Sequence, residues 1–477
     1  MLSIGAMAVG QCGYYLDLAR EDYYFEGGEP AGKWLGKGAE KLGLTGVVER
    51  EHLERLLSGY APDGRALVQN AGRADRQTGW DLCFSAPKSV SVLWSQSSQD
   101  VRQAIQEAHH CAVESAVALL ETEIVKSRRG KDGLLREPAR IFVATFEHGT
   151  SRALDPQLHT HSLLVNLAVR DDETTGTIVS RPVYLNKMLV GAYYRNELAF
   201  SMQQLGYEIE REKGLFELSC VPKALMKLFS KRRAAIEKEL KDKGLETASA
   251  AAFATFSTRP EKNGVPPRGK LFEEWQEFAR DHGFKFQGRT RPYTPRSDKA
   301  KDRTVARLVR EAADDITKSA CHFTEPQLIR RVLELSPGRG MSSGEVCAGV
   351  RLRLGREHEI ELLGEYLNEN RYTTRQVART ERQFATDARA LAWSKRDGVA
   401  NKHIDAVLRN YTNEPIPILK EVVHRSREFS FSIKEELKHH AKQLTRAARK
   451  QWTEPIDRSR FARPRLSDPH SEHTTRA

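Results

Sequence analysis

The chain has 477 residues, enough for two or three domains, and 39% hydrophobic and 29% charged residues indicate a globular protein with polar segments. No apolar stretch approaches the ~20 residues of a membrane span, the N-terminus lacks a signal-peptide pattern, and six scattered cysteines without a C-x-x-C pair favour a reduced, cytoplasmic protein. The net charge of +12 favours a polyanionic partner such as nucleic acid.

Two tyrosine doublets stand near the N-terminus, Tyr14-Tyr15 and Tyr23-Tyr24. Packing is the usual role of aromatic residues, and it would suffice if the chain held no other reactive groups. A tyrosine hydroxyl can also attack a phosphodiester and form a covalent phosphotyrosine. Its ordinary pKa of about 10 makes it a weak nucleophile at neutral pH, so this chemistry needs a metal ion that polarises the phosphate.

Two stretches, residues 27–33 and 264–270, satisfy the G-x-x-x-x-G-K pattern of a phosphate-binding loop. However, Trp34 and Leu271 stand where a serine or threonine must contact magnesium, and neither stretch follows a convincing strand. We therefore expect no nucleotide cofactor at either position.

Residues 80–91 predict a strand, a turn that contains Pro87 and the start of a helix. Asp81 could orient a histidine through its second ring nitrogen or accept a tyrosine proton, and a strand-edge carboxylate without a chemical role is the alternative. Lys88 is a candidate contact for a DNA phosphate near the helix N-terminus. In the helical stretch that follows, residues 101–125, we expect the His109-His110-Cys111 run to be structural, because adjacent residues on a helix diverge by ~100°.

Three histidines follow in a pattern typical of a metal site. His159 and His161 are two apart in a strand-like run, residues 158–165, so both side chains point to one face. His148 ends another strand-like run, and residues 149–156 between the two runs have the composition of a loop that lets the strands pair. Ordinary strand histidines would explain His-x-His alone, but the third histidine favours an ion with open coordination positions.

The rest of the chain is less informative. Residues 196–205 and 223–244 predict helices, and a boundary is expected at 295–302, within a basic region rich in glycine and proline. Residues 303–410 are mainly helical by pattern, and 424–477 form a basic polar tail whose end is expected to be disordered.

Taken together, several segments resemble the signatures of MobF-type conjugative relaxases, which are HUH endonucleases. The resemblance covers about residues 1–290, with the motifs in family order. It is carried by the tyrosine doublets, His148 and residues 36–44, 84–91, 150–152 and 155–161.

The resemblance implies an α+β fold in which helices flank a central antiparallel sheet with the histidines on adjacent central strands, followed by a mainly helical C-terminal region. It implies metal-dependent, site- and strand-specific nicking and rejoining of plasmid DNA at a transfer origin, through a 5′-phosphotyrosine. The implied roles are Tyr14 as principal nucleophile, Tyr23 as second nucleophile, Tyr15 and Tyr24 as their substitutes, Asp81 beside the nucleophile or a ligand, and His148, His159 and His161 as ligands. The family usually works with Mg²⁺ or Mn²⁺, whereas three imidazoles by themselves also suit Zn²⁺.

The implied partners are single-stranded DNA at the transfer origin, relaxosome accessory proteins and a coupling protein. Lys37, Lys88 and Arg152 are the candidate phosphate contacts. On this interpretation residues 1–295 form the relaxase domain, and residues 303–410 resemble the start of a helicase segment without a Walker A loop, so we expect no helicase activity.

Two other functions remain open at this point. A rolling-circle replication initiator shares the histidine pair and the tyrosine chemistry, but the third histidine and residues 84–91 favour the relaxase. A non-catalytic DNA-binding transfer accessory protein would have lost the reactive residues, which here are all present. Incubation with a single-stranded oligonucleotide and Mn²⁺ separates the enzymes from the accessory protein.

Overall fold

The computed structural model describes residues 1–8, 13, 29–130, 133–212, 214–242, 266–284, 290–354, 359–366 and 369–393. All four tyrosines of the doublets lie outside the described residues, as does the C-terminal tail. The chain divides into two compact units, one of Met1–Ile316 with His322–Thr373 and one of Thr317–Cys321 with Thr374–Ala477. No helix in the described part is both long and apolar enough to span a membrane.

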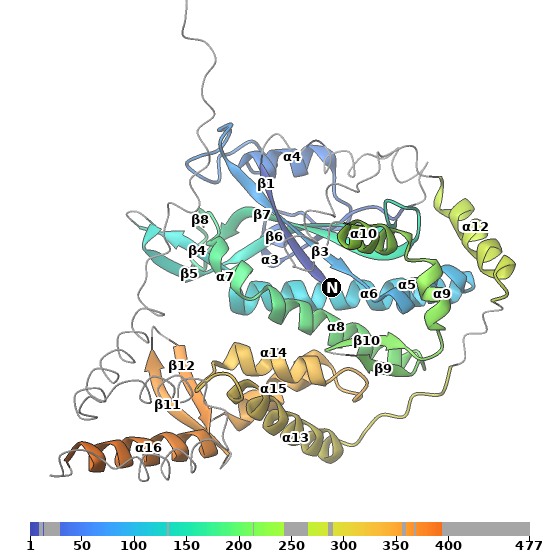
Figure 1. Ribbon diagram of the computed structural model, residues 1–477. Helices are drawn as coiled ribbons and strands as arrows, with labels where there is room; N and C mark the ends of the chain where they lie inside the picture. The colour runs from blue at the N-terminus through green and yellow to red at the C-terminus, as the bar shows by residue number, and fades with distance from the viewer. Residues whose placement is uncertain are drawn as a thin grey trace, which may run out of the picture. The chain divides into compact units, whose positions relative to one another are not determined.

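A six-stranded antiparallel sheet forms the centre of the first unit (Figure 1). The strand order is β1-β3-β7-β6-β2, and the short strand β8 pairs with β7. These strands are β1 (Leu2–Ala8), β2 (Lys33–Leu35), β3 (Gln77–Ser85), β6 (Arg140–Thr150), β7 (Pro156–Val169) and β8 (Thr175–Gly176). The expected α+β class with a central antiparallel sheet is confirmed.

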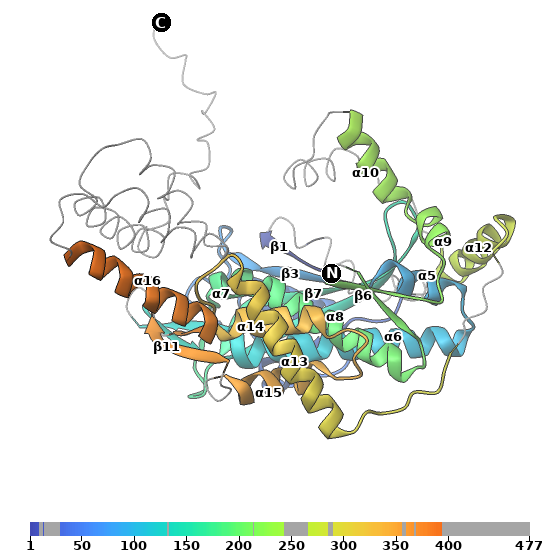
Figure 2. The same ribbon diagram turned by 60° about the horizontal axis from the view of Figure 1, so that its bottom comes forward.

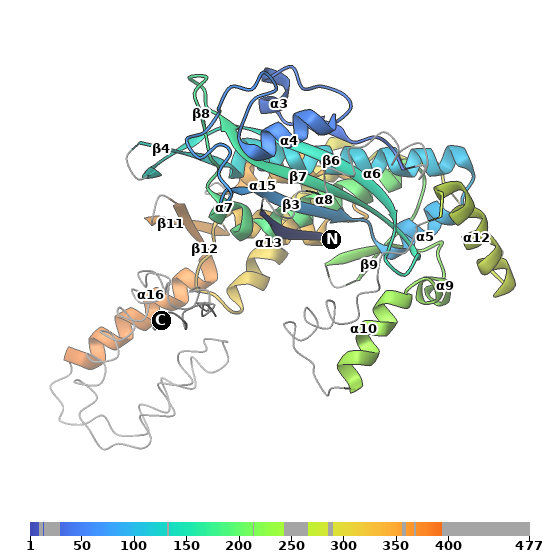
Figure 3. The same cartoon turned by 90° about the horizontal axis from the view of Figure 1, so that it is seen from above.

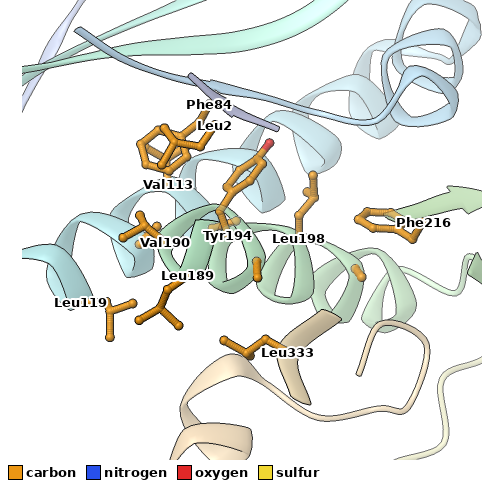
Figure 4. Close-up of a cluster of buried hydrophobic side chains, with 14 of the residues drawn as sticks. Leu2, Phe84, Val113, Leu119, Leu189, Val190, Tyr194, Leu198, Phe216 and Leu333 are labelled. Carbon is orange, nitrogen blue, oxygen red and sulfur yellow. The ribbon is translucent and has the colours of Figure 1, made fainter. Parts of the chain in front are cut away.

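One face of the sheet packs against long helices. They are α5 (Lys88–Gln96), α6 (Gln99–Leu119), which continues into the π-helical turn η2 (Leu120–Ile124), and α8 (Lys187–Gln204). In the main core, Leu2 and Phe84 of the sheet lie near Tyr194 of α8 (Figure 4). Alternation along a strand sends every second residue to this face, which is why the even-numbered Leu158 and Leu164 of β7 belong to the same core.

The opposite face carries a smaller core. It is covered by α3 (Lys37–Lys41) and α4 (Arg50–Ser58), and Figure 1 shows α4 on the other side of the sheet from α6 and α8. Leu53 and Leu56 of α4 are fully buried with Leu163 and Val165 of β7. Because the odd-numbered residues of β7 face this side, His159 and His161 continue the same row beyond the edge of the apolar cluster.

Smaller elements surround the sheet. They are β4 (Lys126–Arg129) paired with β5 (Leu135–Pro138), α7 (Ser180–Leu185), β9 (Ile209–Glu212) paired with β10 (Leu215–Leu218), α9 (Lys223–Leu228), α10 (Lys231–Asp242) and α12 (Arg268–Asp281). The single helix expected over 223–244 is therefore wrong. The chain breaks at Phe229 and Ser230, and α10 starts anew with Ser230 at its N-terminus, where the carbonyl of Ser230 accepts from Ala234 N at 3.0 Å.

The chain beyond residue 297 continues with α13 (Asp298–Thr317), α14 (Glu325–Leu335), α15 (Ser343–Arg353), β11 (Ile360–Tyr366), β12 (Glu369–Thr374) and α16 (Arg375–Trp393). Leu333 of α14 lies in the main core beside α8 (Figure 4), and Asn196 of α8 donates to Met341 O at 3.2 Å. The division into compact units therefore falls later than the expected boundary at 295–302. The β11–β12 hairpin also departs from the helical pattern expected there.

Candidate functional site

The three histidines lie on one antiparallel hairpin. In the β6–β7 register His148 is opposite His159, and Phe146 is opposite His161. Residues directly opposite in adjacent strands share a face, as do residues two apart in one strand, so all three imidazoles emerge on the same side. The loop between the two strands consists of residues 151–155, which is shorter than the predicted 149–156. The reason is that β6 extends to Thr150, with a register shift between His148 and Thr150, and β7 begins at Pro156.

The three rings form a nearly equilateral triangle. The distance between ring centroids is 5.3 Å for His148 and His159, 5.1 Å for His148 and His161, and 5.3 Å for His159 and His161. His148 is buried and the other two rings are half-buried. Such a triangle of imidazoles suits one ion with coordination positions left open on the solvent side.

Hydrogen bonds select the nitrogen that can bind the ion. The Nδ1 of His159 donates to Gln157 O at 2.8 Å, and the Nδ1 of His161 donates to the Asp81 carboxylate at 2.8 Å. In both rings Nε2 is then the nitrogen with a lone pair to offer a metal. Asp81 stands on β3, the neighbour of β7, where a carboxylate behind a histidine is the arrangement expected of a residue that orients a ligand.

The protonation of this cluster favours the histidines over the nearby thiol. Burial, together with the neighbouring His161, lowers the pKa of His159 to about 4, so its ring is neutral at physiological pH. Cys83 has a ligand atom within 4.8 Å of those of His159 and His161. However, burial and then the charge of Asp81 raise the pKa of Cys83 to about 12, so binding through sulfur would require removing a proton at high cost.

The three candidate phosphate contacts differ in position. Lys37 is exposed at the start of α3, and Arg152 is exposed in the loop that joins β6 to β7. Lys88 is half-buried, and its Nζ donates to Pro156 O at 2.9 Å. Burial lowers the pKa of Lys88 to about 8, against the opposing charges of Asp155 and Glu217. In this structure Lys88 therefore supports the base of the hairpin, and a phosphate contact would replace that bond.

A polar layer behind the histidines is not apparent from the sequence. His109 lies between Thr160, whose Oγ1 is 2.9 Å from Nε2, and Tyr194, whose hydroxyl is 2.8 Å from Nδ1. Burial lowers the pKa of His109 to about 3, so it is a neutral core residue, in agreement with the structural role expected for its run. The adjacent His110 lies 2.6 Å from Glu147, the residue that precedes His148. The sequence indicates this polar layer only through the alternation of side chains along β6 and β7, which sends Glu147 and Thr160 to the face opposite the histidines.

Comparison with known proteins agrees with this geometry. The sequence profile of the TrwC relaxase family matches residues 9–282, which include the tyrosine doublets, Asp81 and the three histidines. The multifunctional conjugation protein TraI of Escherichia coli is 31% identical over 391 residues, which are 76% of this chain and 21% of TraI. The chain thus spans about a fifth of the length of this relative.

Solved structures show the same similarity. The conjugative relaxase TrwC in a metal-bound complex with oriT DNA is 31% identical, with a TM-score of 0.55, over 60% of this chain and 100% of that one. A copper-bound TrwC complex with oriT DNA is 32% identical, with a TM-score of 0.54 and the same coverage. Since the family profile covers more than half of the sequence and the fold matches as well, this chain belongs to the TrwC relaxase family.

Proposed function

We propose that this protein nicks and rejoins one strand of plasmid DNA at a transfer origin, through a covalent 5′-phosphotyrosine. The observation that carries the proposal is the histidine triangle with Asp81 behind His161, in a chain whose solved relatives bind oriT DNA. Replication initiation at another kind of origin is the outcome that the substrate test below distinguishes.

The proposed ion site consists of His148, His159 and His161. Three neutral nitrogen donors fit a divalent ion, and we propose Mg²⁺ or Mn²⁺, with Zn²⁺ as the alternative that an all-imidazole set favours. Solved TrwC complexes include a metal-bound and a copper-bound form, which supports a metal site in the family. When bound, the ion would polarise the scissile phosphate and stabilise the charge of the transition state.

The proposed nucleophile is Tyr14, with Tyr15 as its substitute. Its hydroxyl oxygen forms a bond to phosphorus, the bond from phosphorus to the 3′ oxygen breaks, and that oxygen leaves with a proton as a 3′ hydroxyl. Because the product is itself a phosphodiester, the reverse attack by a 3′ hydroxyl rejoins the strand without ATP. Tyr23, with Tyr24 as its substitute, would carry the second transfer, and Asp81 would orient His161.

We also propose the partners and the domain roles. Single-stranded DNA at the transfer origin is the substrate, with Lys37 and Arg152 as exposed phosphate contacts, and accessory proteins and a coupling protein assemble with it. Residues 1–295 form the segment that acts on DNA, which is consistent with a family match over 9–282. Helices α14 and α15 would support it by packing on α8.

The test uses single-stranded oligonucleotides that cover the transfer origin of the plasmid carrying this gene. With Mn²⁺ we expect a covalent adduct that retards the protein in a denaturing gel, and peptide mapping should locate it at Tyr14. Tyr14→Phe should remove or strongly reduce the adduct while largely sparing DNA binding, whereas the control Tyr184→Phe, at a residue 43% exposed on α7, should not. Full-rate adduct formation by a Tyr14→Phe, Tyr15→Phe double variant would refute the assignment.

A further inference from the structure

Helix α12 begins with a buried arginine that contacts the back of the histidine hairpin. Only 8% of the Arg268 side chain is exposed, and its guanidinium donates from Nη2 to Glu147 at 2.6 Å. The same guanidinium lies 3.3 Å from Glu29 through Nη1. Helix α12 packs beside α5 (Figure 2), so one side chain connects this outer helix to two segments distant in sequence.

Glu147 is a buried carboxylate with several polar neighbours. It precedes His148 in β6 and points to the opposite face of the sheet, where it also receives Gln106 Nε2 at 2.9 Å and lies 2.6 Å from His110. A paired carboxylate in this position holds the backbone of β6 next to His148.

Glu29 is the second carboxylate that the same arginine contacts. Its side chain is 11% exposed, and it accepts a hydrogen bond from the backbone N–H of Gly149 at 3.1 Å. In sequence it stands five residues beyond Tyr24, the last tyrosine of the doublets. Glu29 therefore touches β6 on one side of His148, while Glu147 belongs to β6 on the other.

The contact is closely packed. The Arg268 guanidinium lies over the Trp94 ring, with Cζ 4.6 Å from the centroid. A Cβ on Gly149 would lie 2.6 Å from the Trp94 ring and 3.3 Å from Arg268 Nε, so only glycine allows this approach. Trp275, two turns along α12, donates from its indole to Leu154 O in the hairpin loop at 2.8 Å. Figure 3 shows β6 and β7 running side by side toward the end of the sheet near α5.

We propose that Arg268 is a positioning residue for strand transfer: by binding Glu147 and Glu29 together, it fixes the strand that carries His148 relative to Glu29, the residue at which the described chain resumes after the tyrosine doublets. The inference rests on the proposed function. A planar guanidinium can serve two carboxylates at once, whereas a lysine ammonium in its place has no such fork. The Arg268 side chain is buried against Glu147, Glu29 and the Trp94 ring, so its proposed effect is on geometry.

The main test compares Arg268→Lys with Arg102→Lys. Arg102, on α6, also contacts α12, because its guanidinium lies over the Phe272 ring with Cζ 3.8 Å from the centroid. Glu29 and Glu147 are not among its ion-pair partners in the described part of the chain, so it is a matched control. We expect Arg268→Lys to slow adduct formation about tenfold at saturating oligonucleotide and Mn²⁺, a loss typical of residues that orient a site. The Kd for the oligonucleotide and the rate of Arg102→Lys should remain close to wild type.

A second readout does not depend on catalysis. In the DNA-free protein, hydrogen exchange at the Gly149 amide should be faster in Arg268→Lys and in Glu29→Gln, and the double variant should add little to either. Faster exchange in a protein whose wild type forms no adduct would support the link from Arg268 to β6 and refute the proposed function instead. The positioning role would be overturned if Arg268→Lys changed neither the rate of adduct formation nor the hydrogen exchange of the Gly149 amide. It would also be overturned if Arg102→Lys slowed adduct formation as much as Arg268→Lys does.

Discussion

Asp81 allows a quantitative test of the histidine site, because it contacts a candidate ligand rather than the ion. The perturbation is Asp81→Asn, which keeps the size of the side chain and a carbonyl oxygen that can still accept from His161 Nδ1. What it removes is the negative charge 2.8 Å from the ring. Asp81→Ala removes the acceptor as well.

The size of the effect follows from burial and distance. The side chains of Asp81 and His161 are 13% and 16% exposed, so solvent screens the bond only weakly. A hydrogen bond to a charged group in such a place contributes about 1.5–3 kcal/mol. Since ~1.4 kcal/mol corresponds to a factor of ten in an equilibrium constant, we expect metal affinity to fall about tenfold in Asp81→Asn and up to about 100-fold in Asp81→Ala.

Titration calorimetry with Mn²⁺ and with Zn²⁺ measures these affinities directly. Asp100→Asn, at an exposed carboxylate of α6, is the matched control and should bind both ions as wild type does. Adduct formation by Asp81→Asn should recover in excess metal if the loss is one of affinity. Wild-type affinity in Asp81→Ala, together with a large loss in His161→Ala, would refute the reasoning that Asp81 orients a ligand.

Three further predictions concern the scaffold of the site. Burial lowers the pKa of His109 from 6.5 to about 3. As the pH falls below 6.5, the His109 ring takes up a proton in the unfolded chain but not in the folded one, so the free energy of unfolding decreases. Between pH 7 and pH 5 the decrease is about 2 kcal/mol. His109→Gln should remove that part of the pH dependence of urea unfolding, and an unchanged dependence would contradict it. Gly149→Ala, with its Cβ 2.6 Å from Trp94, should destabilise the fold by about 1–3 kcal/mol in thermal unfolding, whereas Gly5→Ala meets nothing within 4 Å and should not. Glu121 accepts backbone bonds from β6 at 2.7 Å and from α3 at 3.0 Å, so Glu121→Ala should cost about 3 kcal/mol of unfolding free energy, and a loss below about 1 kcal/mol would show that water replaces it.

The sequence alone predicted the strands that carry the histidines and the face they share. A strand has a period of two, so His159 and His161 must point to the same side whatever the rest of the fold does. The loop composition indicated that the two strands could pair and bring His148 near them, and the structure supplies the register, with His148 opposite His159. The fold class required the family resemblance, because strand order is not a local property of the sequence. The tyrosine roles stay predictions, since those residues lie outside the described part of the chain.

Other features depend on contacts between distant segments. The start of α10 lies near Asp155, some 75 residues earlier, with Lys231 Nζ 3.9 Å from its carboxylate, and the packing of Leu333 onto α8 draws α14 into the first compact unit. Local propensity carries no information on such contacts, because burial is decided by which surfaces meet.

The sequence by itself determined which residues can bind a metal ion or attack a phosphate. For the histidines it also determined the strands that carry them, through the period of two. The tertiary structure decided how those residues are held: Asp81 meets His161 only because β3 pairs with β7, and Arg268 meets Glu147 only because α12 packs on α5. A short buried hydrogen bond or ion pair needs two groups within about 3 Å, and only the packed chain brings residues so far apart in sequence that close together.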